Sequence, residues 1–126
     1  MSEKAIVITS GNLISIQDIE VKDGSMLNGL QEIVGGYIEI TRPFRTKELL
    51  CMIINEEGLL MDLPVNLAAS NLFRGTIVGD VAIVQEGFRD GEQDLIGLSD
   101  DLIQTIYYLL RVSYPYLKEA QKDGNS

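Results

Sequence analysis

Basic and aromatic side chains gather in two short segments of the sequence, where they could bind a phosphate-bearing ligand. The first segment contains Arg42, Phe44, Arg45 and Lys47, and the second contains Phe73 and Arg74. Arginine offers a planar fork that matches phosphate, and an aromatic ring or a guanidinium plane can stack on a base. The two segments predict a nucleotide site, although a polar loop with ion pairs would use the same residue types.

Two asparagines, Asn66 and Asn71, precede the second segment. An asparagine side chain can read the polar edge of a base, cap a helix or occupy a left-handed turn. We include both in the predicted ligand-binding set, and capping and turns stay open as alternatives. The full predicted set is Arg42, Phe44, Arg45, Lys47, Asn66, Asn71, Phe73 and Arg74.

The sequence contains no histidine, which removes several classes of catalytic and metal site. Ser-His-Asp triads, Cys-His pairs and histidine-based metal centres cannot form. The single cysteine, Cys51, lies in the apolar run "LLCMII", where we expect a buried thiol and no intrachain disulfide. We therefore predict a binding protein without catalytic residues, cofactor or metal. An enzyme acting on a nucleotide would lack a convincing acid/base pair.

The glycine pair in "EIVGGYIEI" suggests a phosphate loop, but its position argues against one. Phosphate loops place glycines between a strand and the beginning of a helix, where free N–H groups face the anion. Gly35 and Gly36 instead follow a helical pattern and precede a strand-like one. We expect Gly35 and Gly36 to end a helix in the left-handed conformation that glycine adopts readily.

The formal net charge of −9 and the sequence pI near 4.3 narrow the range of partners. General binding to DNA or RNA relies on lysine and arginine neutralising phosphates, so neither is expected, and an anionic membrane surface is disfavoured too. The acidic stretch "EGFRDGEQD" lacks the ligand spacing of an EF-hand calcium loop. The acidic residues either keep the protein soluble or form a surface that imitates nucleic acid. No apolar run approaches the ~20 residues that cross a membrane, and we expect a cytoplasmic protein.

Apolar periodicity predicts a series of short strands that must position the basic and aromatic side chains. In the strand at 13–21, Ile14 and Ile16 share one face, whereas Ile19 and Val21 share the other, so we expect a bulge or strand end at Gln17-Asp18. The run at 48–55 is apolar throughout, which is typical of a strand covered on both faces. The expected strands are 5–8, 13–21, 37–41, 48–55, a short returning strand at 59–61, and one or two strands within 76–85.

Helical periodicity appears in two main segments. Met26, Leu30, Ile33 and Val34 share one face of a first helix, which Asp23 or Ser25 can cap. The last helix begins at the cap Ser99, carries Asp100 and Asp101 in its first turn, and ends at or kinks near Pro115. Residues 64–73 form a short helix or an irregular crossing with Asn66 as a possible cap, and 86–97 are expected to be a mobile acidic loop.

These elements predict a single α+β domain at 1–121 with a disordered tail at 122–126. We expect a mostly antiparallel, twisted sheet of about five or six strands, packed by the first helix and the C-terminal helix. The apolar arc of the C-terminal helix is wider than one small sheet needs. It either wraps the sheet edge or forms a homodimer or higher oligomer, with contacts from Tyr107, Tyr108, Tyr114 and Tyr116.

Four strings in order, "LQEIVGGYIEI", "IINEEGLLMDLPVN", "IVGDVAIV" and "GLSDDLI", span about residues 28–105. They resemble the pattern of a small family from bacteria, phages and plasmids that is catalogued only as a domain of unknown function. Such genes often look like accessory cargo of mobile elements, and small acidic cargo proteins commonly counter host defence. One known class consists of α+β sponges that sequester the nucleotide signals of Thoeris and cyclic-oligonucleotide immune systems.

The resemblance implies two hypotheses for a protein acting in the cytoplasm of a bacterial host. The first is a counter-defence sponge that binds a nucleotide-derived immune signal without cleaving it. In this hypothesis the arginines hold phosphates, Phe44 or Phe73 stacks a base, and Asn66 or Asn71 reads polar edges. The alternative is an acidic inhibitor that blocks a basic nuclease or restriction complex. Its surface would consist of Glu86, Asp90, Glu92, Asp94, Asp100 and Asp101.

Overall fold

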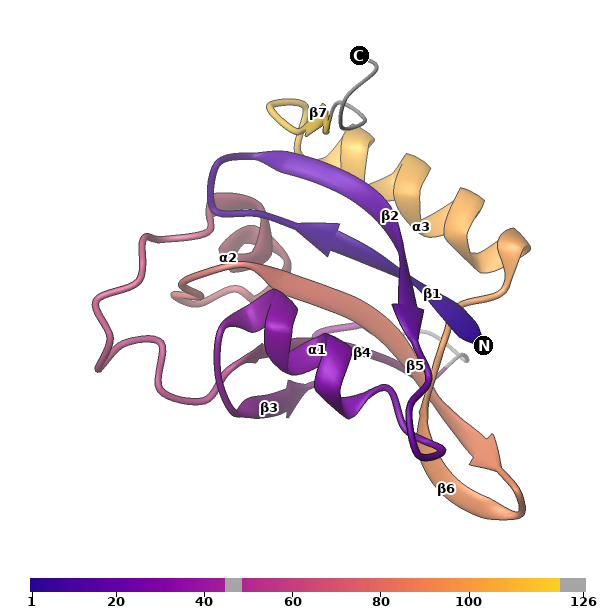
Figure 1. Cartoon of the computed structure of the whole chain (residues 1–126). Coiled ribbons are helices and arrows are strands. Elements are labelled where there is room, and N and C mark those ends of the chain that lie inside the picture. Colours follow the sequence, from indigo (N-terminus) through magenta and orange to yellow (C-terminus); the bar gives the residue numbers. More distant parts are fainter. Residues whose placement is uncertain (45–48, 121–126) are drawn as a thin grey trace.

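The computed structural model describes residues 1–44 and 49–120 (Figure 1). Its elements are β1 (Ser2–Ile8), β2 (Leu13–Glu20), α1 (Leu27–Val34), β3 (Ile38–Thr41), β4 (Leu50–Asn55), α2 (Leu67–Phe73), β5 (Val81–Arg89), β6 (Glu92–Ile96), α3 (Asp100–Ser113) and β7 (Lys118–Glu119). This is the predicted α+β domain, with a seven-stranded sheet where five or six strands were expected. Arg45 and Lys47 of the predicted site and the predicted tail at 122–126 lie outside the described residues.

The sheet, whose strands Figure 1 shows, separates two hydrophobic clusters of side chains. The strand order is β3-β4-β5-β1-β2-β7, with β6 paired to β5, and every pairing is antiparallel except that of β2 with β7. The larger cluster lies against α2 and α3, and the smaller cluster lies against α1. In β4, Met52 belongs to the larger cluster and Cys51 to the smaller. Cover on both faces explains why the β4 sequence is apolar throughout.

The predicted bulge at Gln17-Asp18 is wrong. The β1–β2 register runs without interruption from Ser2 opposite Glu20 to Ile8 opposite Ile14. Ile14 is buried in the larger cluster, and Ile19 is buried in the smaller one. The apolar phase therefore shifts because the two ends of β2 bury opposite faces, and the strand itself stays regular.

Two segments differ from the expected elements. Residues 56–62 form consecutive turns, so the returning strand expected at 59–61 is absent there, and Leu60 is 84% exposed. The acidic segment expected to be a mobile loop forms the β5–β6 hairpin. Asp90 and Gly91 at its tip both have positive φ, at 52° and 83°. An Asp-Gly pair is a sequence signal for a two-residue hairpin turn, because such a turn needs positive φ at both positions.

Local signals set the ends of α1 and α3. The Ser99 hydroxyl accepts a hydrogen bond from the backbone N–H of Leu102, and α3 ends before Pro115. Gly35 adopts φ 81° at the end of α1, and its N–H donates to the carbonyl of Gln31. This confirms that the glycine pair ends a helix. Ser25 also accepts a hydrogen bond from the N–H of Leu27 at the start of α1.

Candidate functional site

Four of the residues predicted from the sequence line one surface hollow. The loop after β3 supplies Arg42 and Phe44, and the end of α2 supplies Phe73 and Arg74. Pro43 and Leu72 complete the described lining, and the hollow has a volume of about 480 Å³. This volume lies within the range of small-molecule sites in proteins, about 300–1,000 Å³. Two segments about thirty positions apart in the sequence therefore meet at one place.

The two phenylalanines are held differently. Phe44 is half-buried and packs against the larger hydrophobic cluster, which fixes one wall of the hollow. Phe73 is 42% exposed, so part of its ring is accessible to a ligand. A Cβ atom at Gly75 would lie 3.2 Å from Phe73 Cδ2, so glycine at this position leaves room for the ring. A flat ligand could therefore stack on Phe73 without moving the core.

Arg42 is already engaged with a carboxylate. Its Nε donates a hydrogen bond of 2.9 Å to Glu86 Oε2, and its Nη2 donates to Glu86 Oε1. The paired Arg42 guanidinium holds the pKa of Glu86 below its usual range, chiefly through this hydrogen bond. Arg42 therefore ties the loop after β3 to β5, and it can still offer a ligand both N–H groups of Nη1, the second N–H group of Nη2 and the face of its guanidinium.

Arg74 occupies an unusual backbone conformation. It ends α2 with φ 60° and ψ 41°, and its N–H donates to the carbonyl of Ser70. A left-handed conformation costs a residue other than glycine about 1 kcal/mol and is often found at functional sites. The C-terminal end of a helix repels anions, so a phosphate at this place would depend on the arginine side chains.

Asn66 cannot bind a ligand, because its side chain is buried and hydrogen-bonded inside the protein. Its side chain is fully buried, and Nδ2 donates to the carbonyls of Ile8 and Gly79 at 3.0 and 2.9 Å. Its Oδ1 accepts a hydrogen bond of 3.1 Å from the N–H of Ala69, which caps α2. Every polar group of this amide is used inside the protein, so capping is the correct alternative. Asn71 is exposed on α2 and does not line the hollow.

The predicted acidic surface is partly neutralised. Glu86 pairs with Arg42, as described above. Asp94 pairs with Arg89 at 3.1 Å, and Asp100 lies 3.7 Å from Lys4. Half of the six acids assigned to a nucleic-acid-like surface therefore have a basic neighbour. These pairs lower the negative charge that the surface could present to a basic partner.

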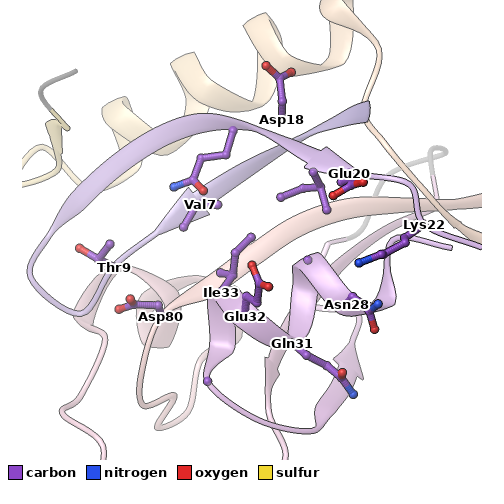
Figure 2. Close-up of a pocket in the computed structure, with 14 residues that line it drawn as sticks. Val7, Thr9, Asp18, Glu20, Lys22, Asn28, Gln31, Glu32, Ile33 and Asp80 are labelled. Atoms are coloured by element: carbon purple, nitrogen blue, oxygen red, sulfur yellow. The ribbon is translucent and has the colours of Figure 1, made fainter. Parts of the chain in front are cut away.

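A larger hollow, of about 960 Å³, lies between α1 and the β1–β2 hairpin (Figure 2). In Figure 2, Glu32 and Ile33 reach from α1 toward Val7 and Asp80, whereas Asp18 projects from the opposite side of β2. The lining residues include the four acids Asp18, Glu20, Glu32 and Asp80, although the Asp18 carboxylate points away from the hollow. Among the described residues, Lys22 is the one basic residue that lines it. A phosphate would be repelled there, and none of the predicted site residues that the structure describes lines this hollow.

Two kinds of feature are absent from the described ranges. Over 1–44 and 49–120, no group of three or more cysteine, aspartate or glutamate side chains is placed to hold a metal ion. No helix in the same residues is long and apolar enough to cross a membrane.

The sequence did not point to the partners that define the smaller hollow. Leu72 and Pro43 line it, but an isolated leucine or proline carries no signal for a site. Glu86, which accepts hydrogen bonds from Arg42, lies on β5, 44 positions later in the sequence. The only sequence signal for this pair was opposite charge, which fits many other pairings as well.

Comparison with known proteins assigns the chain to a family. The sequence model of a domain of unknown function, DUF3846, matches residues 2–111. The chain belongs to the DUF3846 family. This confirms the expected family at the level of a domain of unknown function. No curated protein matches the DUF3846 chain.

The DUF3846 chain is similar in fold to a solved structure. That structure is described as the crystal structure of small RNA methyltransferase HEN1, and the superposition has a TM-score of 0.59. The match covers 80% of this chain and only 15% of the methyltransferase chain, with 15% sequence identity. At this identity the likeness concerns the fold alone.

Proposed function

We propose that this DUF3846 protein binds a nucleotide-derived small molecule in the hollow formed by Arg42, Phe44, Phe73 and Arg74. The observation that carries the proposal is the convergence of two arginines and two aromatic rings from separate segments around one hollow of about 480 Å³. On a chain of net charge −9, such a local combination matches a ligand with both a flat base and a negative charge.

The side chains have different tasks in the proposed complex. The accessible ring of Phe73 stacks on the base, and Phe44 forms a wall that the core keeps in place. Arg74 binds the phosphate, because Arg42 already spends two of its donor nitrogens on Glu86. The ion pair with Glu86 keeps the Arg42 guanidinium at the rim, where its face can contact the ligand.

The proposal includes sequestration without cleavage. The described lining consists of arginine, proline, phenylalanine and leucine, and none of these side chains is a general acid or base near neutral pH. The resemblance to phage and plasmid cargo proteins supports a ligand from the nucleotide signals of bacterial immunity, either cyclic ADP-ribose-type or cyclic oligonucleotides. The protein would act in the cytoplasm of the bacterial host by keeping such a signal from its receptor.

We also propose self-association through the outer side of α3. Leu109 is 54% exposed, and Tyr116 after the helix is 71% exposed. Large exposed apolar side chains are typical of surfaces that bind another protein copy. Sedimentation should report a dimer or higher oligomer that Leu109→Glu converts to monomer.

Titration of matched variants tests the binding site. Wild-type protein is first screened by thermal shift against cyclic ADP-ribose isomers and cyclic di- and trinucleotides, and the best ligand is then titrated by calorimetry. We expect Phe73→Ala and Arg74→Ala to weaken binding at least tenfold, about 1.4 kcal/mol each. The control variants are Phe88→Ala and Arg111→Ala, which remove an exposed ring and an arginine at other places.

The results separate the hypotheses clearly. Equal affinity of the site variants and the controls would refute the hollow as the binding site. If no nucleotide binds, the sponge hypothesis fails. Tight, salt-sensitive binding to a basic defence protein would then support the acidic inhibitor instead.

A further inference from the structure

Among the described residues, the edge strand β2 is only partly paired on its outer side. β7 pairs with β2 at Leu13 and Ile14 in parallel register. Within residues 1–44 and 49–120, no strand pairs with Ile16–Glu20 on the side away from β1. Unpaired edges of this kind can accept a strand from another chain.

The short β7 strand shows which backbone groups of β2 point outward. The N–H of Lys118 donates to the carbonyl of Asn12 at 2.9 Å, and the N–H of Ala120 donates to the carbonyl of Ile14 at 3.0 Å. Because outward and inward groups alternate along a strand, the N–H and C=O groups of Ile16, Asp18 and Glu20 point outward as well. The outward N–H and C=O groups of β2 beyond Ile14 therefore have the same spacing as those that bind β7.

An apolar groove lies beside this open edge. It has a volume of about 550 Å³, and Ile16 of β2 forms one wall. The other wall comes from the side of α3 that carries Ile103, Tyr107 and Tyr108. Ile16 is 47% exposed, and Ile103 belongs to the larger hydrophobic cluster below it. A strand added at the edge would place every second side chain over this groove.

We propose that this edge and groove bind an extended segment of a partner protein by strand addition. Ile16, Asp18 and Glu20 share one face of β2, the face toward α3. Alternate side chains of the added strand therefore lie beside Ile16, Asp18 and Glu20 in turn. The matching segment therefore carries an apolar residue beside Ile16. It carries basic residues two and four positions away, opposite the exposed Asp18 and Glu20.

A second copy of this chain fits the edge poorly. Pairing two β2 strands about a two-fold axis at Asp18 would set the two Asp18 carboxylates opposite each other, and like charges directly opposite are destabilising. Each copy also carries a net charge of −9, which adds repulsion at close approach. A basic partner segment gains from the same charges.

Short peptides test strand addition directly. The probes are the capped peptide Thr-Leu-Thr-Lys-Thr-Lys-Thr and its reversed sequence, titrated into the full chain by NMR. We expect one of them to bind and to shift the amide signals of Ile16, Asp18 and Glu20 most. Backbone N-methylation at alternate residues should abolish binding in one alternating set and preserve it in the other, because only one set of N–H groups faces β2.

Two protein variants complete the test. Ile16→Lys should weaken peptide binding at least tenfold, whereas Leu60→Lys, which makes the same change at an 84% exposed residue far from the groove, should leave binding unchanged. The proposal is overturned if no peptide binds at about 1 mM or if both methylated sets bind alike. It is also overturned if Ile16→Lys dissociates an oligomer of the free protein, since a second copy would then occupy the groove.

Discussion

Replacement of Asn66 by alanine should unfold the protein more easily and leave ligand affinity intact. The amide makes three hydrogen bonds of 2.9–3.1 Å, and the side chain is fully buried. Alanine leaves the carbonyls of Ile8 and Gly79 and the N–H of Ala69 without these partners. At about 1–1.5 kcal/mol for each of the three lost bonds, the free energy of unfolding should fall by about 3–4.5 kcal/mol. Total stabilities of small domains are about 5–15 kcal/mol, so the loss is large.

Urea unfolding at constant temperature measures this loss. Asn71→Ala is the matched control, because Asn71 is an exposed asparagine on the same helix, and its unfolding free energy should change by less than about 0.5 kcal/mol. Asn66→Asp should be worse than alanine, since it removes both N–H donors and places a carboxylate against two carbonyl oxygens. Folded Asn66→Ala protein should bind ligand as wild type does. Unchanged stability together with lost binding would refute the structural role of Asn66.

Three further predictions concern packing, pH and reactivity. Gly29→Ala should lower the unfolding free energy by about 1–2 kcal/mol, because the new Cβ would lie 2.4 Å from Ile19 Cγ2. This overpacking outweighs the higher helix propensity of alanine. A rise in the urea midpoint would contradict the prediction. Arg89 hydrogen-bonds Glu3 and holds the pKa of Glu3 below its usual 4.5. The stabilisation is therefore present above that pH and lost as pH falls below it, and the melting temperature of Glu3→Gln should depend less steeply on acid pH than that of wild type. Burial raises the pKa of Cys51 to about 12, so iodoacetamide at neutral pH should modify it only after unfolding, and rapid labelling of native protein would refute this burial.

Local chemistry made the ends of α1 and α3 predictable. Gly35 and Ser99 fulfil their roles through groups within four positions of themselves. The β5–β6 hairpin carried an equally local signal in Asp90-Gly91, but the acidic composition of the segment outweighed it in the interpretation. Residues 59–61 were misassigned to a strand, because exposed leucines there imitate one.

The roles of Asn66 and Arg42 depend on tertiary contacts with residues far away in the sequence. The role of Asn66 depends on Ile8, which lies 58 positions earlier, and the state of Arg42 depends on Glu86, which lies 44 positions later. No periodicity or spacing in one sequence reports such distant partners. The convergence of Arg42 and Phe44 with Phe73 and Arg74 could be proposed from residue types, whereas the burial of Asn66 could be known only from the fold.

The most direct test of the proposed function is the recovery of ligand from its complex. The protein is incubated with the tightest-binding nucleotide, freed from unbound ligand, and denatured by heat, and the released molecule is examined by chromatography and mass spectrometry. Intact ligand, recovered from wild type and lost with Arg74→Ala, is the result that sequestration in the hollow predicts. Release of a cleaved product, or equal recovery from Arg74→Ala, would contradict the account.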